Sequence, residues 1–165
     1  FALLGNYALS IQFLSIMLII PSIVFQYTLS QDATGNLSKK IKKISIGSSI
    51  VVACLGIVLS PIVIPIIFPD YVEAIQLIQI ISLMVIPSSI ILAYNSELLG
   101  KEKSRFVLIG QGVSVSVYLV GLLTLGLIIG INGVATSLVL SSICQAVFYI
   151  IIIRYLKNQE ALRSN

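Results

Sequence analysis

The 165-residue chain contains no histidine and no tryptophan, and it contains only two cysteines. Without histidine there is no histidine-based nucleophilic catalysis, and two thiols alone cannot complete the usual four-ligand zinc site. Cys54 and Cys144 both lie in apolar stretches, where a thiol usually packs as a small hydrophobic side chain. The sequence therefore predicts no metal site, no cofactor and no enzyme activity.

Charge is also scarce, since only 10% of the residues are charged and 58% are hydrophobic. Soluble domains average about 25% charged and about 45–50% apolar residues, so a water-soluble globule, a nucleic-acid module and a disordered tail are excluded. Segments such as 50–59 and 149–153 are apolar at every position, unlike the alternating strands of a membrane barrel. We predict an all-α integral membrane protein, with the lipids of the surrounding membrane among its partners.

Clusters of charged and turn-forming residues divide the chain into five apolar stretches, each long enough for the roughly 20 residues of a transmembrane helix. We predict a single transmembrane region over residues 1–165, with spans at about 2–27, 44–68, 71–99, 106–129 and 133–153. Because the first residue is Phe1 and the apolar stretch begins at once, we expect a fragment truncated at its N-terminus, within a longer polypeptide.

Basic residues occur after every second predicted span. Lysines or arginines are found at 39–43, 101–105 and 154–163, whereas 69–70 and 130–132 have none. Lys and Arg concentrate on the cytoplasmic side of membrane proteins, so we expect the N-terminus outside and the C-terminus in the cytoplasm. The pI of about 9.2 then reflects topology and attraction to anionic lipids rather than a nucleic-acid partner.

Polar side chains recur on one face of the first and third predicted spans. Two interpretations stay open, a helix contact held by hydrogen bonds and a hydrophilic substrate path, because lipid satisfies neither amides nor hydroxyls. The candidate pathway residues are Gln12, Ser15, Ser22, Gln26, Gln76 and Gln79.

Two prolines interrupt these same spans. Pro87 is expected to kink the third span, either as a static bend or as a hinge, with the hydroxyls of Ser88 and Ser89 near the freed carbonyls. Pro21 lies beside the polar stripe of the first span and is expected to tilt its inner half.

Apart from Glu73, at the start of the third span, Glu97 is the only acidic residue that falls within a predicted span. An intramembrane carboxylate often marks ion or proton coupling, so Glu97 is a candidate coupling residue. The favoured alternative is an ion pair at the inner interface with Lys101, four residues further along the helix.

Small residues form stripes that predict close helix packing. Gly56 is the smallest member of a stripe on the second span. The stripe comprises Ser49, Ala53, Gly56 and Ser60. Small residues also occur in pairs four positions apart, at Gly110/Ser114, Gly112/Ser116 and Gly126/Gly130.

Three segments resemble the polysaccharide-biosynthesis or oligosaccharide flippase family, which belongs to the multidrug, oligosaccharidyl-lipid and polysaccharide exporter superfamily. They are IPIIFPDYVEAIQLIQI at 64–80, the stretch from ELLGKEKSRF through GLIIGINGVATSL to RYLK within 97–157, and GNYALS at 5–10. The resemblance implies the C-terminal part of a two-lobed transporter, with the N-terminal lobe of the same polypeptide missing.

The function that this resemblance implies is export of lipid-linked oligosaccharide or polysaccharide precursors across the plasma membrane by alternating access. One alternative is a cation-coupled multidrug exporter of the same superfamily, although the first span has no deeply placed acid. Another is a scaffold subunit that transports nothing, in which the polar stripes serve only packing.

Overall fold

The computed structural model describes residues 2–19, 21–24, 26–27 and 39–163. This part of the chain is helical and contains no strand. The elements are α1 (Ala2–Met17), α3 (Lys39–Ile67), the 3₁₀ helix η1 (Pro69–Tyr71), α4 (Ala74–Ser82), α5 (Val85–Gly100), α6 (Ser104–Ile129) and α7 (Ile131–Arg163). Asp32 and Gly35, in the polar loop expected after the first span, lie outside the described residues.

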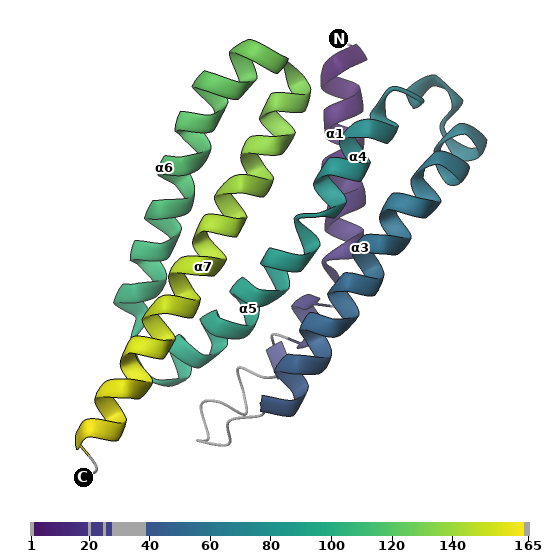
Figure 1. Ribbon diagram of the computed structural model, residues 1–165. Coiled ribbons are helices and arrows are strands. Elements are labelled where there is room, and N and C mark those ends of the chain that lie inside the picture. Colours follow the sequence, from purple (N-terminus) through teal and green to yellow (C-terminus); the bar gives the residue numbers. More distant parts are fainter. Residues whose placement is uncertain (1, 20, 25, 28–38, 164–165) are drawn as a thin grey trace.

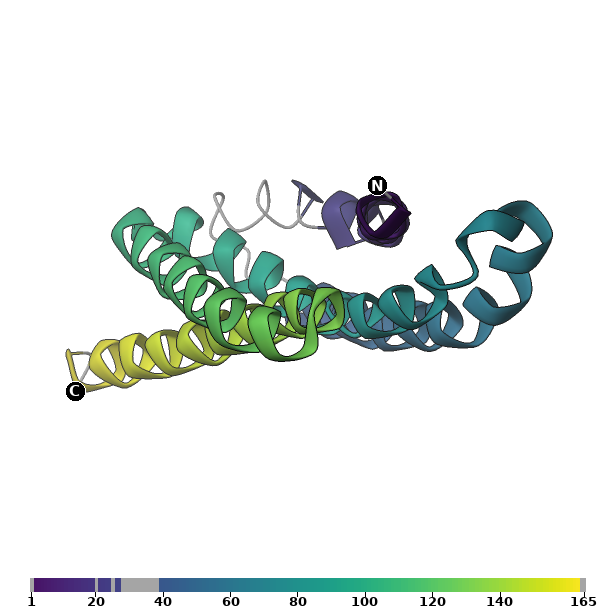
Figure 2. The ribbon, with the colours of Figure 1, turned by 90° about the horizontal axis from the view of Figure 1, so that it is seen from above.

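Seen from above, α3, α4, α5, α7 and α6 form one bent layer, and α1 lies on its concave side (Figure 2). Within the layer, α6 and α7 form an antiparallel hairpin, α7 also packs against α4 and α5, and α3 packs against α4 and α5. Helix α1 packs chiefly on α4. Helix α1 also reaches α6, where the side chains of Tyr7 and Tyr118 hydrogen-bond.

Four helical segments are long and apolar enough to cross a membrane in the part of the chain that the structure describes. They are Ser45–Ile67, Ala74–Gly100, Ser104–Ile129 and Ile131–Gln159. Each corresponds to a predicted span, and the chain has the all-α architecture expected of a membrane protein. The four lysines expected in a loop at 39–43 instead begin α3.

The predicted first span is interrupted at Leu18. Helix α1 ends at Met17, and helical backbone resumes at 19, 21–24 and 26–27. Pro21 has no N–H to donate to the Met17 carbonyl, so the helix breaks one turn before the proline. The interruption lies on the N-terminal side of Pro21, while the tilt of the inner half and the crossing of the membrane by 2–27 stay predictions.

The predicted third span is likewise two helices, because α4 ends at Ser82 and α5 starts at Val85. The break lies one turn before the buried Pro87, which cannot donate to the Leu83 carbonyl. Ser89 Oγ donates to the Ile86 carbonyl at 2.9 Å. The prediction that this hydroxyl satisfies the carbonyl freed by Pro87 is therefore wrong.

The two breaks meet at a glycine of α3. A Cβ atom at Gly56 would overlap Met17 Cε and come within 2.7 Å of Ser82 Oγ. Ser82 Oγ in turn lies 3.7 Å from Met17 Sδ. The other members of the predicted stripe, Ser49, Ala53 and Ser60, are buried as well, which confirms its packing role.

Glycines also set the distance between α6 and α7. A Cβ atom at Gly110 would overlap the ring of Tyr149, and one at Gly121 would lie 2.7 Å from Ser137 Oγ. Gly112 has nothing within 4 Å of the same position, so its predicted packing role is wrong within the described chain. Gly130, with φ +67°, forms the turn between the two helices.

Candidate functional site

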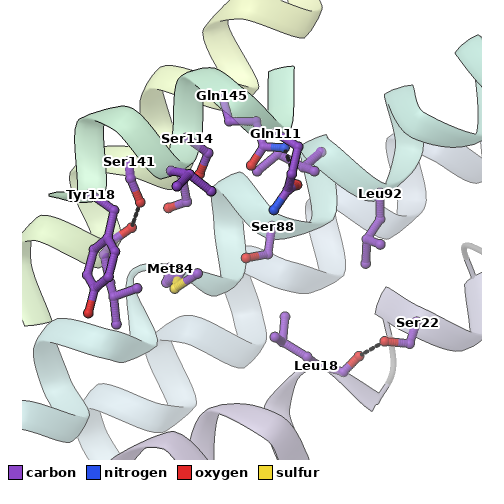
Figure 3. Close-up of a pocket in the computed structure, with 14 residues that line it drawn as sticks. Leu18, Ser22, Met84, Ser88, Leu92, Gln111, Ser114, Tyr118, Ser141 and Gln145 are labelled. Carbon is purple, nitrogen blue, oxygen red and sulfur yellow. Dashed lines mark hydrogen bonds between the residues drawn. The ribbon is translucent and has the colours of Figure 1, made fainter. Parts of the chain in front are cut away.

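A cavity of about 450 Å³ opens on the concave face, between α5, α6, α7 and the residues that follow α1 (Figure 3). Gln111 and Gln145 lie together at its wall, Tyr118 lies at one side, and Leu18 approaches from the α1 side. The polar lining residues are Ser22, Ser88, Gln111, Ser114, Tyr118, Ser141, Ser142 and Gln145. We call this the polar cavity.

Helical spacing explains why these side chains converge. The lining residues of α6 include 111, 114, 115 and 118, and those of α7 include 138, 141, 142 and 145. Residues three or four apart lie on one face of a helix. Each helix therefore contributes one mixed stripe, and packing of the helices brings these stripes around one space.

Buried amide and phenol groups fix the wall of the polar cavity. Gln145 Nε2 donates to Gln111 Oε1 and to Tyr149 Oη, both at 3.1 Å. Tyr149 Oη donates to the Val107 carbonyl at 3.1 Å. Gln145 and Tyr149 are buried, whereas Gln111 is exposed. The network uses both amide donors of Gln145 and leaves the amide nitrogen of Gln111 on the accessible side.

Serine hydroxyls in the cavity donate back to their own helices. Ser22 Oγ donates to the Leu18 carbonyl at 2.7 Å, and Ser141 Oγ donates to the Leu138 carbonyl at 2.8 Å. A hydroxyl that donates in this way keeps its oxygen lone pairs as acceptors. The described residues of the lining include no aspartate, glutamate, lysine or arginine. The polar cavity therefore offers neutral donors and acceptors, which suit a ligand rich in hydroxyl groups.

Only Ser22 among the predicted pathway residues lines the polar cavity. Gln12, Ser15 and Gln26 are exposed, and Ser15 Oγ donates to the Ile11 carbonyl at 2.9 Å. The stripe predicted on the first span is therefore not gathered into one site by the described residues.

The two predicted residues of α4 occupy different places. Gln79 Nε2 donates to the Ile57 carbonyl of α3 at 3.4 Å, which is a helix contact. Gln76 lines a second cavity of about 330 Å³, together with Glu73 and Asn132. There the buried Asn6 donates from Nδ2 to Glu73 Oε2 at 3.3 Å.

Sequence reasoning missed Gln111 and Gln145, and it assigned Ser114 only to packing. The available signal was the spacing of polar residues at Gln111, Ser114 and Tyr118 on α6, and at Ser141 and Gln145 on α7. This spacing resembles the pattern that drew attention to Gln12 and Ser15, but it falls in helices that looked uniformly apolar.

Glu97 is buried within the helix packing, with 4% of its side chain exposed, and its place at the membrane interface stays a prediction. Lys157 Nζ of α7 lies 3.1 Å from Glu97 Oε1, and the Lys157 side chain is 46% exposed. Lys157 is distant from Glu97 in the sequence, and the sequence analysis had named only Lys101 as a partner of Glu97. The ion pair joins α5 to α7 and does not line the polar cavity.

No group of three or more potential metal ligands occurs among the described residues. No protein family model, no curated protein and no solved structure matches the chain.

Proposed function

We propose that this chain is part of a membrane transporter, and that its polar cavity borders the path of a lipid-linked oligosaccharide or polysaccharide precursor. The observation that carries the proposal is a neutral, hydrogen-bonding cavity enclosed by apolar membrane helices. Lipid cannot satisfy polar groups, so such a lining indicates contact with water, protein or a polar ligand. Sugar hydroxyls match the amide and hydroxyl groups that line it.

The resemblance of three segments to flippases supports the same class of substrate. In this proposal the chain is the C-terminal part of a two-lobed exporter, and the concave face is completed by further helices of the same polypeptide. Exposure of Gln12 and Gln26 on the α1 side fits such a face. Alternating access would then move the headgroup past both lobes.

The proposed setting is the plasma membrane, with the α5–α6 turn and the C-terminus in the cytoplasm. Supporting this orientation, the lysine-rich start of α3, the α5–α6 turn and the C-terminal end share one end of the molecule (Figure 1). In a variant whose native cysteines are replaced, an impermeant maleimide applied to intact cells should label Asp70→Cys and not Lys103→Cys. Labelling of Lys103→Cys alone would contradict the orientation.

A matched pair of serines on α6 tests the substrate path. Ser114 lines the polar cavity, whereas Ser116 is exposed and does not line it. The protein as its cell expresses it is reconstituted into vesicles, and translocation of a fluorescent lipid-linked oligosaccharide is measured per folded molecule. We expect Ser114→Leu to lower the translocation rate about tenfold, because leucine fills the cavity and excludes water from it. A tenfold change in rate corresponds to about 1.4 kcal/mol of activation free energy. Ser116→Leu should stay close to the unaltered protein. Equal rates for both variants would refute the assignment of the cavity.

A cation-coupled exporter is the second candidate, because Glu97 is a buried acid within a span. Its ion pair with Lys157 favours a structural role, since an acid that is already neutralised is less available to an ion. Loss of all transport in Glu97→Gln, at normal expression, would favour the coupled exporter.

A further inference from the structure

A third hollow lies on the other side of the contact between α5 and α7. It has a volume of about 360 Å³, and the described residues that line it are all apolar. The residues that define it are Leu83, Ile86 and Ile90 on one side and Ile143, Val147 and Ile150 on the other. We call this the apolar groove.

The α7 side of the apolar groove continues directly into positive charge. Ile143, Val147, Ile150 and Arg154 follow one another at spacings of three and four, so they lie on one face of α7. Arg154 is exposed and lies one turn beyond the groove. Lys157 follows on the next turn with its ammonium group 3.1 Å from Glu97. Because Lys157 is paired with Glu97, Arg154 supplies the net positive charge at this end of the groove.

These two features fit the two halves of an amphiphile. An apolar hollow of this kind does not hold water, but it accepts hydrocarbon. It lies within the helical segment Ile131–Gln159, which is long enough to cross a membrane, so hydrocarbon surrounds it in the bilayer. Arginine binds phosphate oxygens through paired N–H donors, and its apolar stem allows the guanidinium to reach the headgroup region.

We propose that the apolar groove binds one acyl chain of an anionic membrane phospholipid, whose headgroup phosphate is held by Arg154. A net negative headgroup is favoured over a zwitterionic one by the basic end of the groove. This site is separate from the polar cavity and does not depend on the proposed transport function.

This chain contains no tryptophan, so a single tryptophan introduced into it can serve as a fluorescent probe. Ile143→Trp places one fluorophore at the groove, where Ile143 is 44% exposed. Leu119→Trp is the matched control on α6, since Leu119 is 51% exposed and lines neither cavity nor groove. The two positions lie at similar sequence distances from the Gly130 turn of the antiparallel hairpin, so their depths are comparable.

The intact protein is reconstituted in phosphatidylcholine bilayers that contain a minor fraction of phosphatidylglycerol. In one sample the phosphatidylcholine is brominated and in the other the phosphatidylglycerol, and quenching of the tryptophan fluorescence is measured in each. At Ile143→Trp we expect about a fivefold preference for brominated phosphatidylglycerol, roughly the contribution of one basic side chain at a membrane surface. At Leu119→Trp the two lipids should quench in proportion to their abundance. Adding Arg154→Gln to Ile143→Trp should reduce the preference to about twofold or less.

Quenching in proportion to the abundance of the two lipids at Ile143→Trp would overturn the proposal. So would a preference that survives Arg154→Gln, because the phosphate would then be held elsewhere. Stronger relief of quenching by added polyprenyl phosphate than by unbrominated phosphatidylglycerol would replace the phospholipid with the tail of a lipid-linked substrate. If Ile143→Trp does not fold, Val147→Trp on the same side of the groove supports the same measurement.

Discussion

The contact between α5 and α7 separates two surfaces of opposite character. On the concave side, Ser88 and Ser142 line the polar cavity. On the other side, their chain neighbours Pro87 and Ile143 line the apolar groove. One residue along a helix turns the side chain by about 100°, so neighbours in sequence serve different surroundings. The mean hydropathy of a span therefore does not reveal that one of its faces is polar.

Two interactions support the wall between these surfaces. Tyr149 packs over Gly110 and holds the amide network of the polar cavity. The pair between Glu97 and Lys157 connects α5 and α7 beyond the groove. Removing either interaction tests whether the polar cavity and the apolar groove depend on the same helix packing.

The largest expected effect comes from enlarging Gly110. A Cβ atom there overlaps the ring of the fully buried Tyr149, which has no free space to accept it. We expect Gly110→Ala to lower the free energy of unfolding by about 1–3 kcal/mol, as overpacking does in other cores. Unfolding in mixed micelles with increasing dodecyl sulfate measures the change.

Gly112→Ala is the control for Gly110→Ala. It adds the same methyl group to the same helix, where nothing lies within 4 Å. Its free energy of unfolding should be unchanged or slightly higher. Equal destabilisation by both substitutions would mean that helix flexibility, not the contact with Tyr149, is responsible.

Substituting the two residues of the ion pair is expected to lower the free energy of unfolding by unequal amounts. Lys157→Met leaves the carboxylate of Glu97 buried without this partner, and the cost should be about 2 kcal/mol, below the range for fully buried pairs because Lys157 is half exposed. Glu97→Gln leaves a lysine that water or lipid phosphate can reach, so the cost should be about 0–1 kcal/mol with transport largely intact. The same micelle titration and the vesicle assay compare the two variants, and a larger cost for Glu97→Gln would reverse our assignment of the buried partner.

A smaller loss of stability than at Gly110 is expected at the hydroxyl of Tyr149, and its effect on transport distinguishes the two surfaces. Tyr149→Phe removes a hydroxyl that joins Gln145 to the Val107 carbonyl, and should cost about 0.6–1.7 kcal/mol. It should also loosen the side chain of Gln145 and lower the rate of oligosaccharide translocation. Ile90→Val, in the apolar groove, should leave that rate unchanged. A rate that changes only in Ile90→Val would place the substrate path on the apolar side.

Span boundaries could be predicted because charge and turn residues are conspicuous in an apolar chain. Pro69 and Asp70 follow α3, Gly100 ends α5, and Gly130 separates α6 from α7, as expected. The prolines also indicated the interrupted spans, since a missing N–H acts locally. The candidate site was less predictable, because only Ser22 of the predicted pathway residues lines the polar cavity.

The sequence by itself determined an all-α membrane chain, because backbone polar groups in lipid must be satisfied within each helix. Of its five predicted spans, four match described segments that are long and apolar enough to cross a membrane. Only the tertiary structure decided which stripes of those helices meet. Gln111 and Gln145 are far apart in sequence and hydrogen-bond through packing of α6 on α7, and Lys157 reaches Glu97 through packing of α7 on α5. The physical reason is that local periodicity specifies the face a residue occupies, whereas the neighbour of that face depends on how whole helices fit together.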